Sequence, residues 1–353
     1  MLGAEHKPIM IGRLQRYAMD HVYRRGIHIF QYAPSTGKRI AIIGSGPAGL
    51  SCAGELARLG HSVTVFEKRE LTGGLSTYGI ITLREPMEIA LAEVEMVKRM
   101  GVEFRTGAEL CSSLTLSELR MQSDAIFLGC GLGSTPQLRI PGEEHVVDGL
   151  AYIEQSKLDP SHLDVGQNVI VIGAGNTAID CATIAKRLGA RQVTIVYRRS
   201  DREMTAYEHE HEFAREEGIE FQFLTQPVRI LAENGIVFGL ACVQMALGES
   251  DSCGRRTSQP VPESEFIMPA DQVVKAIGQE KPSLASLLGL ATAPSGHIAV
   301  NGNFETNIPG LYAGGDAIRS SGACSTVMAV EDGKLAARAI HKQLTGLPVP
   351  EAL

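Results

Sequence analysis

Two stretches of the chain repeat one order of apolar and polar positions, and each predicts a strand, a glycine turn, a helix and a second strand. The first begins at Arg39 with RIAIIG and continues through SGPAG and LSCAGELARLG to HSVTVFEK. The second begins at Asn168 with NVIVIG and continues through AGNTA and IDCATIAKRLG to RQVTIVYRR. This order is typical of βαβ units. We therefore predict two dinucleotide-binding modules of the same architecture.

The pattern of apolar and polar positions predicts further helices and strands before, between and after these two units. Helical spacing and end signals predict helices over 10–26, 86–100, 208–218 and 325–344. Short apolar runs predict strands in VEFRTG, DAIFLGCG and DQVVKAIG, and further strand segments are expected around 219–247. The polar, turn-rich residues 248–264 predict an exposed hairpin loop. The predicted fold is α/β, with two Rossmann-like domains and a short N-terminal helical leader.

The leader helix is amphipathic and carries several arginines. Its apolar side chains fall near one face, namely Ile11, Leu14, Tyr17, Ala18 and Val22. Its arginines lie mostly elsewhere, namely Arg13, Arg16, Arg24 and Arg25. Two interpretations stay open: the arginines form a solvated face, or they form a docking surface for another domain.

Composition narrows the class of protein. A chain of 353 residues with 44% hydrophobic and 21% charged residues predicts two globular domains, or three small ones. Its 33 Lys and Arg against 40 Asp and Glu give a net charge of -7, which argues against a nucleic-acid partner. No apolar run is long enough to span a membrane, and the N-terminus has no uninterrupted hydrophobic segment typical of a secretory signal. We expect a cytoplasmic protein.

The cysteines and histidines do not predict a metal site. The 7 cysteines are widely spaced and form no C-x-x-C, which excludes the usual zinc and iron–sulfur spacings and a dithiol redox motif. Cys324, close to the third motif below, is expected to be a small packing residue. His209 and His211 alternate with glutamates and so point to different faces of a helix. We interpret that run, 208–212, as a solvated helix face.

The first glycine motif predicts a dinucleotide site. It reads Gly44-Ser45-Gly46-Pro47-Ala48-Gly49. The first glycine permits the tight turn, the second lets a pyrophosphate approach the backbone, and the third lets helix and strand pack closely. The helix N-terminus then offers N–H groups to the phosphates. Glu67 ends the next strand, where a carboxylate accepts hydrogen bonds from ribose hydroxyls.

The second glycine motif predicts a nicotinamide-nucleotide site. It reads Gly173-Ala174-Gly175-Asn176-Thr177-Ala178. No acid ends its second strand; Arg198 and Arg199 stand there instead. Two guanidinium groups suit a 2′-phosphate and favour NADPH over NADH. In the alternative, one arginine is solvated and the other stacks on adenine, which would serve either nucleotide.

A third motif reads Gly310-Leu311-Tyr312-Ala313-Gly314-Gly315-Asp316. It predicts a short strand that ends in glycines and an aspartate. The Asp316 carboxylate suits the sugar-alcohol hydroxyls of a flavin. The helix expected to begin near Ser325–Thr326 would direct its positive end toward a reduced flavin.

Together these motifs resemble the flavoprotein reductases with two dinucleotide-binding domains. Longer stretches, such as TGGLSTYGI (72–80), GAGNTAIDCA (173–182) and TVMAVEDGKLAARAI (326–340), resemble the small subunit of bacterial glutamate synthase. They resemble still more closely the flavin subunit of NAD(P)-dependent dihydropyrimidine dehydrogenase. The resemblance implies a leader (1–37), a discontinuous FAD-binding domain (38–150 and 283–345), an inserted NAD(P)-binding domain (151–282) and a tail (346–353).

The resemblance also implies site residues and chemistry. The FAD contacts would come from Gly44, Ser45, Gly46, Pro47, Ala48, Gly49, Glu67, Lys68, Gly73, Gly74, Leu75, Gly131, Gly315, Asp316, Thr326 and Val327. The NADPH (or NADH) contacts would come from Gly173, Gly175, Asn176, Thr177, Ala178, Arg198 and Arg199. The nucleotide gives a hydride to FAD without an amino-acid nucleophile or base. Electrons then pass to a partner protein that carries iron–sulfur clusters or to a catalytic subunit.

Two departures from the family pattern stand out. Members usually carry an N-terminal cysteine-rich domain with two iron–sulfur clusters, whereas this sequence begins where that domain would end. We therefore expect clusters on a separate chain, another acceptor, or a truncated gene. The family's G-I-P-x-aromatic-R-L-P reads Gly79-Ile80-Ile81-Thr82-Leu83-Arg84-Glu85-Pro86 here, which retains Arg84. Alternatives are a stand-alone reductase and a non-catalytic FAD-binding scaffold.

Overall fold

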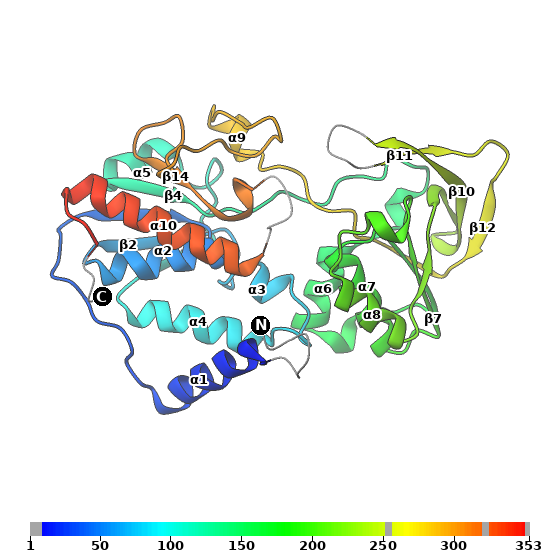
Figure 1. Ribbon diagram of the computed structural model, residues 1–353, viewed down its shortest axis with the longest axis horizontal. Coiled ribbons are helices and arrows are strands. Elements are labelled where there is room, and N and C mark those ends of the chain that lie inside the picture. The colour runs from blue at the N-terminus through cyan, green and yellow to red at the C-terminus, as the bar shows by residue number, and fades with distance from the viewer. Residues whose placement is uncertain (1–8, 251–255, 320–324, 350–353) are drawn as a thin grey trace.

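The structure is a computed structural model that describes residues 9–250, 256–319 and 325–349. Two lobes lie side by side, each built on a five-stranded parallel sheet (Figure 1). The sheet of the first lobe has the order β14 (Leu311–Ala313), β4 (Ala125–Leu128), β1 (Arg39–Ile43), β2 (Ser62–Glu67), β3 (Glu103–Thr106). The sheet of the second has the order β5 (Val147–Asp148), β13 (Gln272–Lys275), β6 (Asn168–Ile172), β7 (Gln192–Val196), β8 (Glu220–Gln222). The predicted α/β fold is confirmed.

The first sheet is buried on both faces. Successive residues of β1 point to opposite sides of the sheet, and each side packs against its own hydrophobic cluster. Ile40 and Ile42 belong to the hydrophobic cluster beneath α2 (Pro47–Arg58) and α10 (Thr326–Thr345). Ala41 and Ile43 belong to a second cluster with Leu119 of α5 (Leu116–Gln122). Helix α10 follows the strand contributed by the C-terminal part of the chain and packs on α2 (Figure 1). That contact brings the two ends of the first lobe together.

The second lobe repeats this plan and adds an antiparallel sheet. Helices α6 (Gly149–Leu158) and α7 (Asn176–Arg187) share its main hydrophobic cluster, and α8 (Glu208–Glu216) lies beside α7. The added sheet is formed by β9 (Thr225–Glu233), β10 (Ile236–Ser250), β11 (Arg256–Pro260) and β12 (Phe266–Pro269). The hairpin predicted over 248–264 is present as the antiparallel pair β10–β11, but its description as a loop is wrong in part, because β10 extends to Ser250 and β11 lies within the segment. Backbone pairing sustains such a ladder without apolar side chains.

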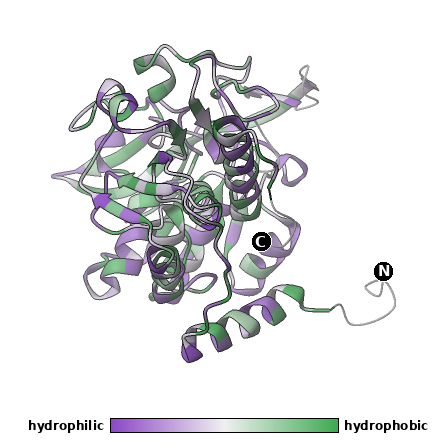
Figure 2. Ribbon diagram, turned by 90° about the vertical axis from the view of Figure 1, so that its left-hand side faces the viewer, coloured by the Kyte–Doolittle hydropathy of each residue, from purple (hydrophilic) through white to green (hydrophobic). Residues whose placement is uncertain are grey.

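The predicted leader forms a helix, α1 (Ile11–Arg25), that stands clear of both sheets and lies beside α4 (Met87–Arg99) (Figures 1 and 2). None of its residues is buried. The segment that follows is tied to the first lobe where Thr36 N donates to the carbonyl of Gly60 at 2.9 Å. The remaining helices are short, among them α3 (Leu75–Tyr78) and α9 (Leu284–Leu287). Within the described ranges no helix combines the length and apolar character that a membrane span requires.

Candidate functional site

The first glycine turn joins β1 to the N-terminus of α2 and is closely packed. Gly44 has a φ of +93°, and a Cβ there would lie 2.6 Å from the carbonyl oxygen of Gly129. A Cβ at Gly49 would lie 1.9 Å from the carbonyl oxygen of Gly44. Gly46 is the N-cap of α2, and Pro47 is its first residue. The first and third glycines are therefore required by space, as the motif predicts.

Glu67 holds this turn in place. Its side chain is buried, and its Oε2 accepts hydrogen bonds from the amide and hydroxyl of Ser45 at 2.9 and 2.7 Å. Its Oε1 accepts from the amide of Arg69 at 2.9 Å. The sequence assigns this acid to a ribose; the structure adds the turn as a second partner. A carboxylate has lone pairs for both, since two oxygens offer about four acceptor positions.

A second turn from the predicted set touches the first. A Cβ at Gly74 would lie 2.6 Å from the Cα of Gly46, and the amide of Gly73 donates to Ser45 Oγ at 3.0 Å. Leu75 begins α3 and is partly exposed. Lys68, by contrast, points to the surface, where its ammonium lies 3.8 Å from Glu109.

The third motif also reaches the N-terminus of α2. A Cβ at Gly315 would lie 2.9 Å from that of Ala48, and the Gly315 amide donates to the buried Asp332 at 3.1 Å. Burial raises the pKa of Asp316, and among the described residues none donates a hydrogen bond to its carboxylate. A half-buried carboxylate that receives no hydrogen bond from the described residues fits an incoming hydroxyl group. Cys324, predicted as packing nearby, lies outside the described residues.

The remaining predicted flavin residues are exposed or loosely packed. Helix α10 begins at Thr326, with Ser325 as N-cap accepting from the Met328 amide at 3.3 Å. Val327 is 76% exposed, a high value for an apolar side chain at a helix start. Gly131 has a φ of +65° and nothing within 4 Å of a Cβ built there. These residues are therefore not held by close packing among the described residues.

The second glycine turn joins β6 to α7. A Cβ at Gly173, whose φ is +128°, would lie 2.1 Å from the carbonyl oxygen of Ala276, and Gly175 is the N-cap of α7. The segment before α8 closes over this turn. The amides of Thr205 and Ala206 donate to the carbonyl of Ala174 at 3.3 and 3.1 Å. The first residues of α7 are Asn176, Thr177 and Ala178, and the side-chain oxygen of Asn176 accepts from the Tyr207 amide at 3.2 Å.

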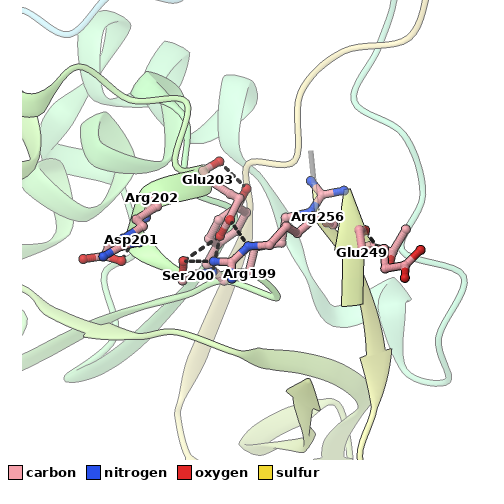
Figure 3. A network of polar contacts seen from close by, with 9 residues as sticks. Arg199, Ser200, Asp201, Arg202, Glu203, Glu249 and Arg256 are labelled. Carbon is pink, nitrogen blue, oxygen red and sulfur yellow. Dashed lines mark hydrogen bonds and ion pairs between the residues drawn. The ribbon is translucent and has the colours of Figure 1, made fainter. Parts of the chain in front are cut away.

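Arg198 and Arg199 follow β7 and, among the described residues, differ in their contacts. Arg198 is exposed, whereas Arg199 Nε donates to the carbonyl of Arg256 at 3.2 Å. The Arg256 guanidinium in turn contacts Glu203 at 2.8 Å (Figure 3). Hydrogen bonds from Ser200 and then from Arg256 lower the pKa of Glu203 to about 2. No local sequence signal indicates Arg256, because only the antiparallel sheet brings it beside Arg199.

The predicted solvated face at 208–212 is wrong for Glu210. Glu210 is 7% exposed and forms an ion pair with Arg84 of the first lobe. His211 packs edge-on against Phe221, and its Nε2 is buried. A run of alternating charged residues does not indicate which one is buried, because a helix packed on a neighbour buries only some of its positions.

Side chains of the types that bind metal ions do not form a cluster in the described part of the chain. The five described cysteines are free, and three of them, Cys52, Cys181 and Cys242, are buried. Cys253 lies outside the described residues, as does Cys324. Across residues 9–250, 256–319 and 325–349 there is no group of three His, Cys, Asp or Glu placed to hold a metal ion.

Known proteins share this arrangement. The family model described as pyridine nucleotide-disulphide oxidoreductase matches residues 38–333. The chain is 39% identical to the β subunit of the NADP⁺-dependent formate dehydrogenase of Moorella thermoacetica, over 97% of this chain and 52% of that one. It is 34% identical to the small chain of the NADPH glutamate synthase of Escherichia coli strain K12, over 97% of this chain and 76% of that one. The chain thus spans only about half the length of the formate dehydrogenase subunit.

A solved structure supports the fold. FprA from Mycobacterium tuberculosis, in complex with NADPH, superposes with a TM-score of 0.72 at 21% identity, covering 88% of this chain and 85% of that one. At this identity the likeness concerns the fold. It confirms the predicted architecture of a two-domain flavoprotein reductase.

Proposed function

The chain belongs to the pyridine nucleotide-disulphide oxidoreductase family, and from this premise we propose that it is an NADPH-oxidising flavoprotein that delivers electrons to a partner. The first lobe holds FAD and the second holds NADPH. The proposed lobe boundaries are 38–150 with 283–345, and 151–282. The observation that carries the proposal is the pairing of two glycine turns, each between a parallel strand and a helix N-terminus, with unlike charges at the ends of β2 and β7.

The first lobe fits FAD through two contacts between segments distant in sequence. Gly46 lies against Gly74, and Gly315 lies against Ala48, so the N-terminus of α2 is bordered by glycine backbone on two sides. A pyrophosphate needs this close backbone approach and the N–H groups of the helix. Asp316, with no described donor, would accept from the ribityl hydroxyls.

The chain's own residues would bind and orient; they would not react. FAD, when bound, supplies the chemistry by accepting a hydride from the nicotinamide. The turn at Gly173–Gly175 would hold the nucleotide's pyrophosphate on α7. The N-terminus of α10, at Thr326 and Val327, would place a positive dipole end near the charge that develops on the flavin.

The arginines after β7 support NADPH as the donor. Arg198 is exposed and Arg199 is held by the antiparallel sheet, so two guanidinium groups stand where the ribose 2′-phosphate would lie. Charge-assisted hydrogen bonds to a phosphate are about twice as strong as neutral ones. NADH lacks that phosphate, so these arginines would not strengthen its binding.

We propose a partner subunit or an iron–sulfur protein as the electron acceptor, as in a dihydropyrimidine dehydrogenase or a glutamate synthase-like system. The relatives named above are a β subunit and a small chain, which supports a role as the electron-input subunit. Helix α1 is the proposed docking surface. Its exposed arginines suit a cytoplasmic partner whose contacting surface is acidic. Its apolar residues Ile11, Leu14 and Tyr17 are 61–77% exposed, and exposed arginines flank them.

Steady-state dye reduction separates the candidate functions. We expect the purified protein, with FAD identified by mass after denaturation, to reduce a dye faster with NADPH than with NADH, and to leave a disulfide reagent unreduced. Equal rates with NADH would remove the 2′-phosphate assignment. Bound FAD without any dye reduction would favour the scaffold.

A further inference from the structure

The two lobes meet at a joint formed by residues 69–86 of the first lobe and helices α6, α7 and α8 of the second. Ile81, 4% exposed, belongs to the hydrophobic cluster of the second lobe, with Tyr152 and Ile179. Figure 1 shows α3 next to α6 at this point. The joint therefore contains apolar contact between the lobes, and it is also rich in charge.

Three cations cross the joint. Lys157 of α6 is buried and donates to the backbone carbonyls of Ser76 and Glu85 at 2.7 and 3.1 Å. Arg69 pairs with Glu154 of α6 and stacks on Tyr78, 3.5 Å from the ring centre. These two contacts fix α6. The third cation reaches the helix that carries the nucleotide turn.

Arg84 joins two helices of the second lobe to the first. Its Nη2 lies 2.8 Å from Asp180 of α7, and its Nη1 pairs with Glu210 of α8. Both carboxylates are at most 9% exposed at the side chain, whereas Arg84 is 33% exposed. Glu210 Oε2 is buried and accepts no hydrogen bond from the described residues. One guanidinium therefore neutralises two buried carboxylates that repel each other.

We propose that Arg84 is a positioning residue for hydride transfer: it sets the nucleotide-carrying helix α7 against the flavin lobe by bridging Asp180 and Glu210. The inference rests on the proposed function. Asp180 lies one helical turn beyond Asn176, at the start of α7, so the ion pair acts close to the nucleotide turn. The bound nucleotide moves with α7. The distance between its nicotinamide and a flavin in the first lobe therefore depends on how this joint aligns the two lobes.

Misalignment should affect the rate of reduction more than nucleotide binding. The proposed NADPH contacts, from Gly173 to Arg199, all lie within the second lobe, so they survive when the joint loosens. A displacement of about 1 Å can cost about 10²-fold in rate when reacting atoms must meet. Removing Arg84 leaves two carboxylates buried together without a cation, which favours separation of the lobes at the joint.

The test is a double-mutant cycle of Arg84→Met, Asp180→Asn and the variant with both changes, read by stopped-flow flavin absorbance. We expect Arg84→Met to lower the rate constant of flavin reduction at saturating NADPH by about 10- to 100-fold, with a change in NADPH affinity below about 3-fold. Asp180→Asn in the Arg84→Met background should restore part of the rate, because it removes one of the two stranded charges. A residue that merely supports the fold would show no such rescue.

Arg338→Met is the control for loss of an ion pair away from the joint. Arg338 pairs with the buried carboxylate of Glu55 at 2.8 Å within the first lobe, where Arg58 also contacts Glu55 at 2.9 Å. We expect this variant to keep the wild-type reduction rate. All variants should retain FAD absorbance, which separates a joint defect from cofactor loss.

Amide hydrogen exchange provides a readout without NADPH. In Arg84→Met, exchange should accelerate both in 80–86 and in α8, on the two sides of the joint, and should stay unchanged in Arg338→Met. An unchanged reduction rate in Arg84→Met, or unchanged exchange in α8, overturns the proposal. If NADPH does not bleach the wild-type flavin, the proposed function fails, and the exchange experiment alone decides the role of Arg84.

Discussion

The two glycine turns share a sequence pattern but are supported differently. The first is held from within its own βαβ unit, because Glu67 at the end of β2 accepts from Ser45 in the turn at 2.7 and 2.9 Å. In the second, arginines rather than an acid directly follow β7. Segments from elsewhere in its lobe support it: the residues before α8 bond to Ala174, and the sheet residue Arg256 holds Arg199.

The two turns differ most at the third position of the motif. The first turn has Gly49 there, where an added Cβ would lie 1.9 Å from the Gly44 carbonyl oxygen, whereas the second already accommodates the buried side chain of Ala178. At the first position both turns are tight, since a Cβ at Gly173 would lie 2.1 Å from the Ala276 carbonyl oxygen. The second site depends in addition on the joint and on the antiparallel sheet. The following predictions probe that contrast, in order of decreasing effect.

The largest effect is expected from the third position of the first motif. In Gly49→Ala the new Cβ would meet the Gly44 carbonyl at 1.9 Å, so the first turn must open. We expect loss of FAD and destabilisation by more than about 4 kcal/mol, measured by flavin absorbance and thermal unfolding. Ala178→Gly, at the matching position of the second turn, should cost only about 1 kcal/mol.

Gly54→Ala controls for helix composition. Gly54 lies in α2 as well, but a Cβ there would have no neighbour nearer than 3.7 Å. FAD retention equal to wild type is expected. Loss of FAD in Gly54→Ala, or its retention in Gly49→Ala, would contradict the tight packing of the first turn.

The next effect concerns the choice of nucleotide. Replacing Arg198 and Arg199 together by alanine should lower kcat/KM for NADPH by about 10²-fold, equivalent to about 2.7 kcal/mol of lost phosphate contacts. The value for NADH should change little, since NADH makes none of these contacts. Arg191→Ala, an exposed arginine just before β7, is the control. Equal losses with both nucleotides would refute a 2′-phosphate site.

The pH dependence of stability should differ between the joint and the first lobe. Burial, and then the neighbouring charge of Glu210, raise the pKa of Asp180 to about 7, although Arg84 opposes the shift. A carboxyl with a raised folded-state pKa stabilises most below its unfolded pKa, and that stability is lost as pH rises through 7. We expect Tm to fall by about 2–4 °C between pH 5 and 8, and less in Asp180→Asn.

His61 should make stability depend on pH in the opposite direction to Asp180, with stability lost toward acid pH. Burial, and then His341, lower its pKa to about 4, and its Nε2 lies 2.9 Å from His341 Nδ1. A buried neutral histidine stabilises above its unfolded pKa, and that stability is lost as pH falls from about 6.5 toward 4. His61→Gln should therefore flatten the acid side of the Tm profile and leave the change between pH 7 and 8 intact. A variant that flattens the other side would contradict this assignment.

The smallest effect on the reaction is expected from α1. Reversing charge at Arg13, Arg24 and Arg25 should leave NADPH-driven dye reduction unchanged, since none of these residues lies in either lobe. Complex formation with the acidic partner subunit should be lost, as measured by size-exclusion chromatography after co-expression. Arg16, included in the docking face by sequence, is bound to Asp20 at 2.6 Å and serves as the comparison. Persistence of the complex would exclude α1 as the docking surface.

The sequence predicts the local parts of this molecule and misses the long-range ones. Strand, turn and helix follow from residues adjacent in the chain, so both glycine turns and α10 are predicted close to their observed bounds. The contact of Glu67 with its own turn is missed, because the same acid also fits a ribose. Arg256 is missed because only sheet pairing brings it to Arg199, 57 residues away.

The joint is missed for a similar reason. Arg84 and Glu210 are 126 residues apart, and their charges alone suggest solvated surface. Helix α6 has no clear apolar repeat in GLAYIEQSKL, so its position between the lobes follows from tertiary contacts. How two domains are aligned is thus the part of the site that local pattern does not encode.

Anaerobic titration of the FAD-loaded protein with NADPH would show hydride transfer from the second lobe to the first. One hydride carries the two electrons that FAD accepts. We therefore predict complete loss of the oxidised-flavin absorbance at about one equivalent of NADPH per FAD, and slower bleaching with NADH. Absorbance that stays unchanged with NADPH in excess would contradict hydride transfer between the two lobes.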